Sequence, residues 1–172
     1  MIGKGRARGY NSRVKTLILL SAIPGSGKST WARKYQTEHP NTHIVASDDV
    51  RERVSGSAQN FTKESLVWQT FLEDLNSFAD EPDCTVIADS TNLQNRYRSY
   101  YFEQTPAFDR HILVVFNIPF ETCLRQNKMR TGTRVVPDKA MRALADEFEI
   151  PTQEVIDLYD EYILIGDPFE IK

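Results

Sequence analysis

Residues 16–30 read TLILLSAIPGSGKST, and the change from apolar to glycine-rich sequence within this stretch decides the fold. The apolar run at 16–20 has the composition of a buried strand, and a segment with helical periodicity begins at Lys28. A loop that binds phosphate needs glycines whose backbone N–H groups converge on an anion, a lysine for the β and γ phosphates, and a hydroxyl for magnesium. The stretch contains all three, so it predicts a site for ATP and Mg²⁺. The predicted nucleotide-binding residues are Gly25, Ser26, Gly27, Lys28, Ser29 and Thr30.

Individual roles in this loop follow from its chemistry. We expect Lys28 to neutralise charge on the β and γ phosphates and Ser29 to ligate Mg²⁺. Thr30 is expected to form local hydrogen bonds, with contact to the α phosphate as the alternative. The first position of such loops normally holds glycine, whereas this chain has Ala22 there. We interpret Ala22 as a tolerated departure, because the predicted strand before the loop and the predicted helix after it are both intact.

Apolar runs and helical segments alternate along the rest of the chain. Runs typical of buried strands lie at 16–22, 43–46, 84–89, 111–117 and 161–166. Segments with helical periodicity lie at 28–38, 61–78, 93–104, 120–129 and 137–147. Such alternation predicts an α/β fold in which a mainly parallel five-stranded sheet has helices on both faces. Ligands of these sheets bind beyond the carboxyl ends of the strands, which is where the phosphate-binding loop falls.

The composition fits one domain without a membrane segment. Charged residues make up 26% of the 172, the mean hydropathy is −0.46, and no apolar run approaches the roughly 20 residues that a membrane-spanning helix needs. We therefore predict no membrane association. Cys84 lies in a predicted strand and Cys123 in a predicted helix, and we interpret both as buried free thiols in a reducing cytoplasm.

The amino-terminal residues are basic. Residues 1–13 contain lysine and arginine but no acid, and we predict a flexible tail there, followed by one domain over 14–172. The tail is either a frayed, solvated end or an arm that contacts nucleic-acid phosphates. Since the whole chain has a net charge of −3, a polyanion is expected to bind one face of the protein. The oligomeric state does not follow from the sequence.

A second group of polar residues follows the second predicted strand. Asp48 comes just past the strand and Arg51 lies three residues further on, so a helix beginning here would point both side chains into one cleft. A carboxylate beside an acceptor hydroxyl can take its proton, and an arginine can bind a phosphate through two hydrogen bonds. The alternative is that Ser47 or Asp48 only caps a short helix.

A third polar group lies at the end of the third predicted strand. Asp89 ends the strand, where an acid can orient the water ligands of magnesium. We expect Asp89 to act on the metal through water. As an alternative explanation of this polar group, Asn92, three residues later, could cap the helix that follows.

Residues 130–138, RTGTRVVPD, join two predicted helices and have the composition of a mobile loop. Arg130 and Arg134 would suit closure of this loop over phosphates, and Arg125, one turn earlier, is a third candidate. An enzyme that transfers the γ-phosphate of ATP to an acceptor must exclude water from it, since it would otherwise hydrolyse ATP. We therefore predict an arginine-bearing lid whose cations also stabilise charge in the transition state.

The segment NRYRSYYFEQ at 95–104 interleaves arginines with tyrosines. This pattern invites a role in stacking the bases of single-stranded nucleic acid. Helical spacing offers a simpler explanation, in which Tyr97 and Tyr101 form one packed face of a helix. We favour the packed face.

Four of these stretches together resemble a known family. LSAIPGSGKSTWARKYQ, SDDVR, STNL and RTGTRVVPD occur in the order and spacing seen in the kinase domain of bacteriophage-type 5′-polynucleotide kinase and its P-loop relatives, from about Thr16 to Gly166. The resemblance implies a three-layer P-loop kinase fold with strand order 2-3-1-4-5. It also assigns activation of a 5′-hydroxyl to Asp48 and binding of the acceptor's 3′-phosphate to Arg51. Arg130 resembles the family's lid arginine, but Thr131 is inserted after it, so the register between Arg130 and Arg134 stays open.

The expected function is therefore ATP-dependent phosphorylation of a hydroxyl on nucleic acid, a 5′-OH end of DNA or RNA, with a single strand or an end as the partner. A same-fold alternative is a kinase for a hydroxymethylated base such as 5-hydroxymethyluracil in DNA, for a nucleoside or for another small metabolite. An alternative of another class is a non-catalytic module that senses nucleotide or binds nucleic acid. The complete set of Lys28, Ser29, Asp48 and Arg130 favours catalysis.

Overall fold

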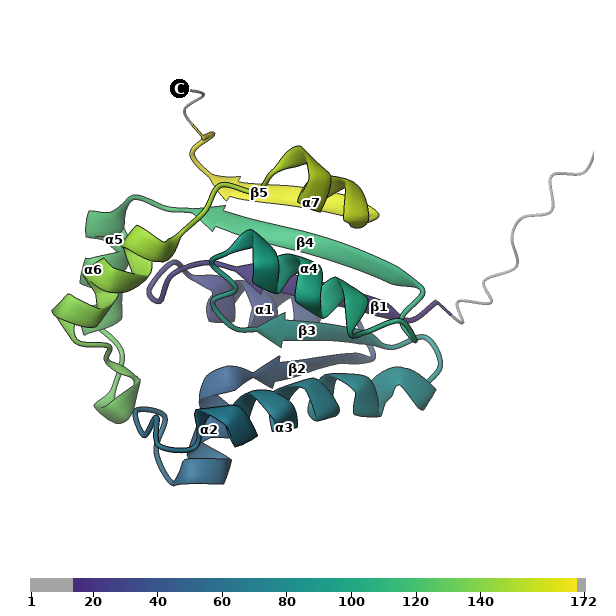
Figure 1. Ribbon diagram of the computed structural model, residues 1–172, viewed down its shortest axis with the longest axis horizontal. Coiled ribbons are helices and arrows are strands. Elements are labelled where there is room, and N and C mark those ends of the chain that lie inside the picture. Colours follow the sequence, from purple (N-terminus) through teal and green to yellow (C-terminus); the bar gives the residue numbers. More distant parts are fainter. Residues whose placement is uncertain (1–13, 170–172) are drawn as a thin grey trace, which may run out of the picture.

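The computed structural model describes residues 14–169, which form a layered α/β structure (Figure 1). The predicted basic tail at 1–13 lies outside the described residues, and the predicted domain boundary at residue 14 stays a prediction. The strands are β1 (Thr16–Ser21), β2 (Thr42–Ala46), β3 (Thr85–Asp89), β4 (Arg110–Asn117) and β5 (Glu161–Gly166). These bounds agree with the five predicted apolar runs to within one residue.

The strands form one five-stranded sheet in the order β2-β3-β1-β4-β5. All four neighbouring pairs are parallel, with Leu17 of β1 opposite Val86 of β3 and His111 of β4. The predicted fold class and strand order are confirmed. After β1 the chain crosses to one side of the sheet to form β2, whereas after β3 it crosses to the other side to form β4. The loops after β1 and β3 therefore flank the point where the strand order reverses.

Helices cover both faces of the sheet and its carboxyl end. They are α1 (Lys28–Glu38), α2 (Ser47–Ser55), α3 (Glu64–Ser77), α4 (Asn95–Glu103), α5 (Phe120–Lys128), α6 (Asp138–Glu147) and α7 (Gln153–Leu158), with single 3₁₀ turns at Phe78–Asp80 and Gly132–Arg134. In Figure 1, α3, α4 and α7 lie in front of the sheet, α1 lies behind it, and α5 and α6 stand beyond the strand ends at the left. None of the described helices is long and apolar enough to cross a membrane.

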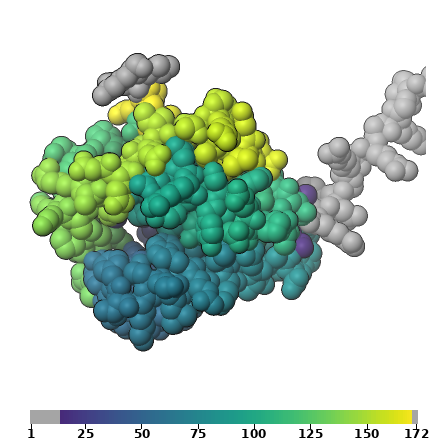
Figure 2. All heavy atoms as spheres, in the orientation of Figure 1, coloured from purple at the N-terminus to yellow at the C-terminus, as the bar shows by residue number. Residues whose placement is uncertain are grey.

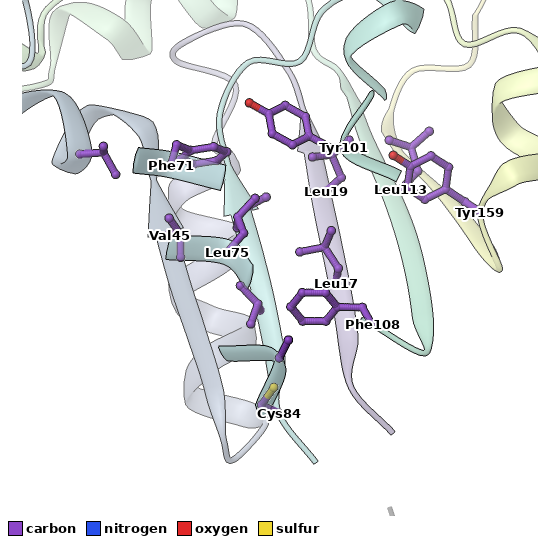
Figure 3. Packing of buried hydrophobic residues seen from close by; sticks show 14 of the residues in the cluster. Leu17, Leu19, Val45, Phe71, Leu75, Cys84, Tyr101, Phe108, Leu113 and Tyr159 are labelled. Atoms are coloured by element: carbon purple, nitrogen blue, oxygen red, sulfur yellow. The ribbon is translucent and has the colours of Figure 1, made fainter. Parts of the chain in front are cut away.

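The sheet is buried on both faces because apolar residues fill both alternating positions of its central strands. Leu17 and Leu19 of β1 pack with Phe71 and Leu75 of α3 on one face, as Figure 3 shows. The intervening Ile18 belongs to the cluster on the other face, which Trp31 and Tyr35 of α1 cover. Cys84 and Cys123 are buried free thiols, as predicted.

Candidate active site

The loop between β1 and α1 has the backbone that only glycine adopts readily. Gly25 and Gly27 have φ angles of 80° and 92°, in the left-handed region. At Gly25 a side chain would also collide with α5, because an added Cβ would lie 2.1 Å from the carbonyl oxygen of Cys123. Burial raises the pKa of that Cys123 thiol to about 11, although the nearby Lys28 ammonium opposes the shift, so the thiol under the loop stays neutral at pH 7. The phosphate-binding loop therefore packs against a neutral thiol of α5 and not against a thiolate.

Position 22 does not require glycine, because the φ angle of Ala22 is not among the positive values found in residues 14–169. Its backbone N–H donates to the carbonyl of Thr91 over 2.9 Å, which ties the start of the loop to the segment after β3. Asn92 adds a second tie, since its amide donates to the carbonyl of Leu20 over 2.8 Å. The alternative role of Asn92 as a helix cap was wrong: Gln94 is the N-cap residue of α4, and Asn92 is buried beside β1.

Lys28, Ser29 and Asp89 meet where the loop begins α1. The Ser29 hydroxyl donates to Oδ2 of Asp89 over 2.7 Å, and the Lys28 ammonium lies 3.8 Å from Oδ1 of the same carboxylate. Within the described residues, Oδ1 of Asp89 is buried and has no hydrogen-bond partner. This carboxylate oxygen could accept a hydrogen bond from a water that is bound to Mg²⁺, while the neighbouring serine hydroxyl binds the metal itself. The three side chains therefore suit the nucleotide and metal roles expected of them.

No cluster of three or more His, Cys, Asp or Glu side chains suited to a metal occurs in residues 14–169. A magnesium ion at this place would take oxygen ligands from Ser29, from phosphates and from water that Asp89 orients. Such sparse protein ligation is usual for Mg²⁺ at nucleotide sites.

Helix α2 begins directly after β2 and presents Asp48 in its first turn. Ala46 is the N-cap residue, and no side chain caps this helix, so the alternative that Ser47 or Asp48 serves only as a cap was wrong. The Asp48 carboxylate accepts a hydrogen bond from Arg51 over 3.0 Å and one from Arg130 over 3.2 Å. Arg134 lies 4.0 Å away. The structure therefore brings Asp48 together with each arginine predicted to share its site.

Arg51 is held more firmly than its sequence position indicates. Its side chain is only 6% exposed, and its Nε and Nη2 atoms donate to the two carboxylate oxygens of Glu64 over 2.7 and 3.2 Å. The Phe61 ring lies 4.7 Å from the guanidinium carbon. Glu64 was not predicted, and no local pattern points to it, because it lies 13 residues from Arg51 on another helix.

The segment between α5 and α6 carries Arg130 and Arg134, as predicted. Besides approaching Asp48, Arg134 donates to Asp49 over 2.8 Å and to Glu52 over 2.7 Å. This segment is therefore held against the acidic residues of α2 by ion pairs. Its motion as a lid stays a prediction. Arg125 is exposed on α5 and lines neither of the two hollows that meet at these side chains.

Two hollows meet at this group of side chains. One, of about 660 Å³, is lined by the phosphate-binding loop and by Thr30 and Arg33 of α1. The other, of about 510 Å³, runs from the loop past Asp48 and Arg51 to α6 and is visible in Figure 2 between the blue α2–α3 region and the yellow-green α6. We call them the donor hollow and the acceptor hollow. Both are lined by Lys28, Ser29, Arg130 and Arg134.

The sheet order, the loop after β1 and the two hollows define a P-loop kinase fold. The AAA_33 family model, described as an AAA domain, matches residues 17–151, and the chain belongs to this family. The resemblance indicated by the sequence motifs is confirmed at this level.

Similar proteins include a phosphodiesterase and a chain of an RNA repair complex. The rat (Rattus norvegicus) 2′,3′-cyclic-nucleotide 3′-phosphodiesterase is 29% identical over 101 residues, which is 59% of this chain and 23% of that protein. A chain of the Pnkp1/Rnl/Hen1 RNA repair complex superposes with a TM-score of 0.70 at 21% identity, covering 90% of this chain and 49% of its own. This chain thus spans about a quarter of the curated relative and half of the repair chain.

Two further structures are matched over most of their length. A fungal RNA kinase has a TM-score of 0.60 at 17% identity, with 89% of this chain and 75% of that chain covered. A gluconokinase from Sinorhizobium meliloti 1021 has a TM-score of 0.57 at 17% identity, with 89% and 84% covered. At these identities the likeness concerns the fold, which kinases for different acceptors share.

Proposed function

We propose that this protein is an ATP-dependent, Mg²⁺-requiring kinase that transfers the γ-phosphoryl group to a hydroxyl of nucleic acid, at a 5′-OH end of DNA or RNA. The observation that carries the proposal is the placement of Asp48. Its carboxylate lines the acceptor hollow, which also reaches Lys28 and Ser29 of the phosphate-binding loop. An acceptor hydroxyl bound between them would have a base on one side and the γ-phosphate on the other.

On the donor side, the backbone of residues 25–30 would hold the phosphates of ATP at the start of α1. Lys28 would neutralise the β and γ phosphates. Bound Mg²⁺ would supply charge that offsets the charge of the phosphate oxygens, with Ser29 as a ligand and Asp89 holding a water. These assignments use Oδ1 of Asp89, which accepts no hydrogen bond within residues 14–169.

On the acceptor side, Asp48 would accept the proton of the hydroxyl as its oxygen bonds to the γ-phosphorus. The bond between that phosphorus and the oxygen bridging it to the β-phosphate breaks, and ADP leaves. Arg130 and Arg134 line both hollows and would stabilise the charge on the transferring group. Arg51 would bind a phosphate of the acceptor while it holds Asp48 in place.

A second candidate is a kinase of the same fold for an acceptor without a phosphate, such as a hydroxymethylated base, a nucleoside or a small metabolite. The observation that favours it is the occupation of Arg51 by Glu64, which leaves this arginine fewer free donors for an acceptor phosphate. The fold of the gluconokinase agrees with either candidate. A non-catalytic nucleotide sensor is the third possibility, and the pairing of Ser29 with Asp89 beside Lys28 speaks against a decayed site.

The deciding experiment incubates the protein with labelled ATP and Mg²⁺ against 5′-OH oligonucleotides of DNA and RNA, DNA that contains 5-hydroxymethyluracil, and nucleosides. We expect label at the 5′ ends. The variant Asp48→Asn should lower kcat by about 10²-fold or more while ATP binding persists. Asp74→Asn is the matched control, because Asp74 contacts Arg53 away from the site. Tight ATP binding without label in any acceptor would sink both kinase candidates.

A further inference from the structure

A third hollow, of about 540 Å³, lies beside α4, and we call it the α4 groove. Its walls include Trp68 of α3, Thr91 after β3, and Arg96, Tyr97 and Tyr100 of α4. Helices α3 and α4 lie on the same face of the sheet in Figure 1. None of the roles assigned above uses this groove.

The groove presents aromatic rings to solvent. Tyr97 is 42% exposed and Tyr100 is 44% exposed, whereas Tyr101 is buried and packs edge-on against Phe71. The expectation that Tyr97 and Tyr101 form one packed face was therefore wrong for Tyr97. Two exposed rings that line one hollow give it the aromatic surface that ligand-binding pockets commonly have.

A cation accompanies the rings. The Arg96 guanidinium carbon lies 4.6 Å from the centre of the Tyr97 ring, and Arg96 also donates to the Tyr97 hydroxyl over 2.9 Å. Exposed rings with an arginine beside them are the combination that holds single-stranded nucleic acid, since rings stack bases and the cation attracts the backbone. Arg98, by contrast, is fully buried and takes no part.

The α4 groove continues the acceptor hollow. Trp68 and Thr91 line both spaces, and the Trp68 ring centre lies 5.8 Å from the guanidinium carbon of Arg51. A polymer whose first hydroxyl reaches Asp48 would therefore pass Trp68 and enter the groove. A nucleoside or a small metabolite would end in the acceptor hollow.

We propose that the α4 groove binds the nucleotides that follow the 5′ end of a single-stranded acceptor. Their bases stack on Tyr97 and Tyr100, and a backbone phosphate lies near Arg96. Glu147 also lines the groove, so the phosphates run on the Arg96 side. This inference rests on the proposed function and specifies its substrate as a single strand several nucleotides long.

The test compares 5′-OH acceptors of increasing length, from a nucleoside 3′-monophosphate to an eight-nucleotide strand. In the wild type, kcat/KM should rise with length. In Tyr97→Ala and Tyr100→Ala it should fall about 5- to 100-fold on the long acceptor and stay unchanged on the mononucleotide. Tyr97→Phe should retain most of the activity, because the ring survives. Ile150→Ala removes an exposed apolar side chain outside the groove and is the control.

The outcomes separate this inference from the proposed function. Unchanged kcat/KM on the long acceptor in both alanine variants, with the kinase otherwise active, overturns the groove alone. If no nucleic acid is phosphorylated, the proposed function is wrong. The groove is then judged by fluorescence anisotropy with a 3′-labelled eight-nucleotide strand, where affinity should fall at least fivefold in Tyr97→Ala. Equal affinity of the variant and the wild type would overturn it.

Discussion

Replacing Glu64 by glutamine tests whether Arg51 binds an acceptor phosphate. Glu64 occupies two nitrogens of the Arg51 guanidinium, at 2.7 and 3.2 Å, and Asp48 occupies the third at 3.0 Å. A phosphate that binds Arg51 must compete with the Glu64 carboxylate. Glutamine keeps the size and one acceptor oxygen but removes the negative charge. If Arg51 binds phosphate, the variant should therefore bind a 3′-phosphorylated acceptor more tightly than the wild type does.

The size of this effect follows from the geometry. Two unit charges about 4 Å apart interact by about 4 kcal/mol at an effective dielectric constant of about 20. Glu64 is partly exposed, and solvent screening reduces the competing interaction to about 1–2 kcal/mol. That difference corresponds to a change in binding of about 5- to 30-fold. It should be confined to acceptors that carry a 3′-phosphate.

The assay measures KM for two short 5′-OH acceptors that differ only in having a 3′-phosphate or a 3′-hydroxyl. We expect Glu64→Gln to lower KM for the phosphorylated acceptor and to leave the other nearly unchanged. Glu73→Gln is the matched control on the same helix, because within residues 14–169 Glu73 accepts a side-chain hydrogen bond from Gln69 alone. If KM for the phosphorylated acceptor rises or stays constant, Arg51 serves to position Asp48 and does not bind phosphate.

Three further predictions concern the metal, the fold and its pH dependence. Asp89→Asn should raise the Mg²⁺ concentration for half-maximal activity about 10- to 100-fold, as seen in a magnesium titration. Arg98→Met should lower the free energy of unfolding by about 3–5 kcal/mol in urea, because buried acceptors that include the Ser21 hydroxyl and the Leu93 carbonyl lose their donor. Burial lowers the pKa of His111 below its usual 6.5, although a hydrogen bond to Thr105 opposes the shift. The contribution of neutral His111 to stability is therefore complete above about pH 6.5 and is lost as the pH falls through the lower folded-state pKa. In thermal unfolding measured against pH, His111→Gln should flatten that loss.

The strands and the phosphate-binding loop could be predicted because their signals are local. The run 111–117 became β4 at Arg110–Asn117, since apolar residues at successive positions suit a strand buried on both faces. Gly25 and Gly27 have the left-handed backbone that such a loop requires. Asp48 and Arg51 meet because they lie three positions apart on one helix.

Other features depend on contacts between distant parts of the chain. Arg134 reaches Asp49 and Glu52 across more than 80 residues of sequence. On α4, helical spacing shows which residues share a face but not which face the fold covers. Arg98 and Tyr101 are the buried residues there. The Arg98 guanidinium donates to the Ser21 hydroxyl of β1 and to the Leu93 carbonyl in the segment after β3. A buried charged residue is the outcome that sequence patterns favour least.

Burial also separates the arginines of the site by what each can do. Arg51 is 6% exposed and held by two carboxylates, so it is a fixed part of the acceptor hollow. Arg130 and Arg134 are 24% and 31% exposed and their carboxylate partners are 32% to 67% exposed, so solvent screens these ion pairs more than those of Arg51. Such pairs exchange at little cost for the more highly charged oxygens of a triphosphate. Both arginines approach the Asp48 carboxylate, so the inserted Thr131 does not remove either from the site, and their solvent-screened pairing suits the lid role predicted for them.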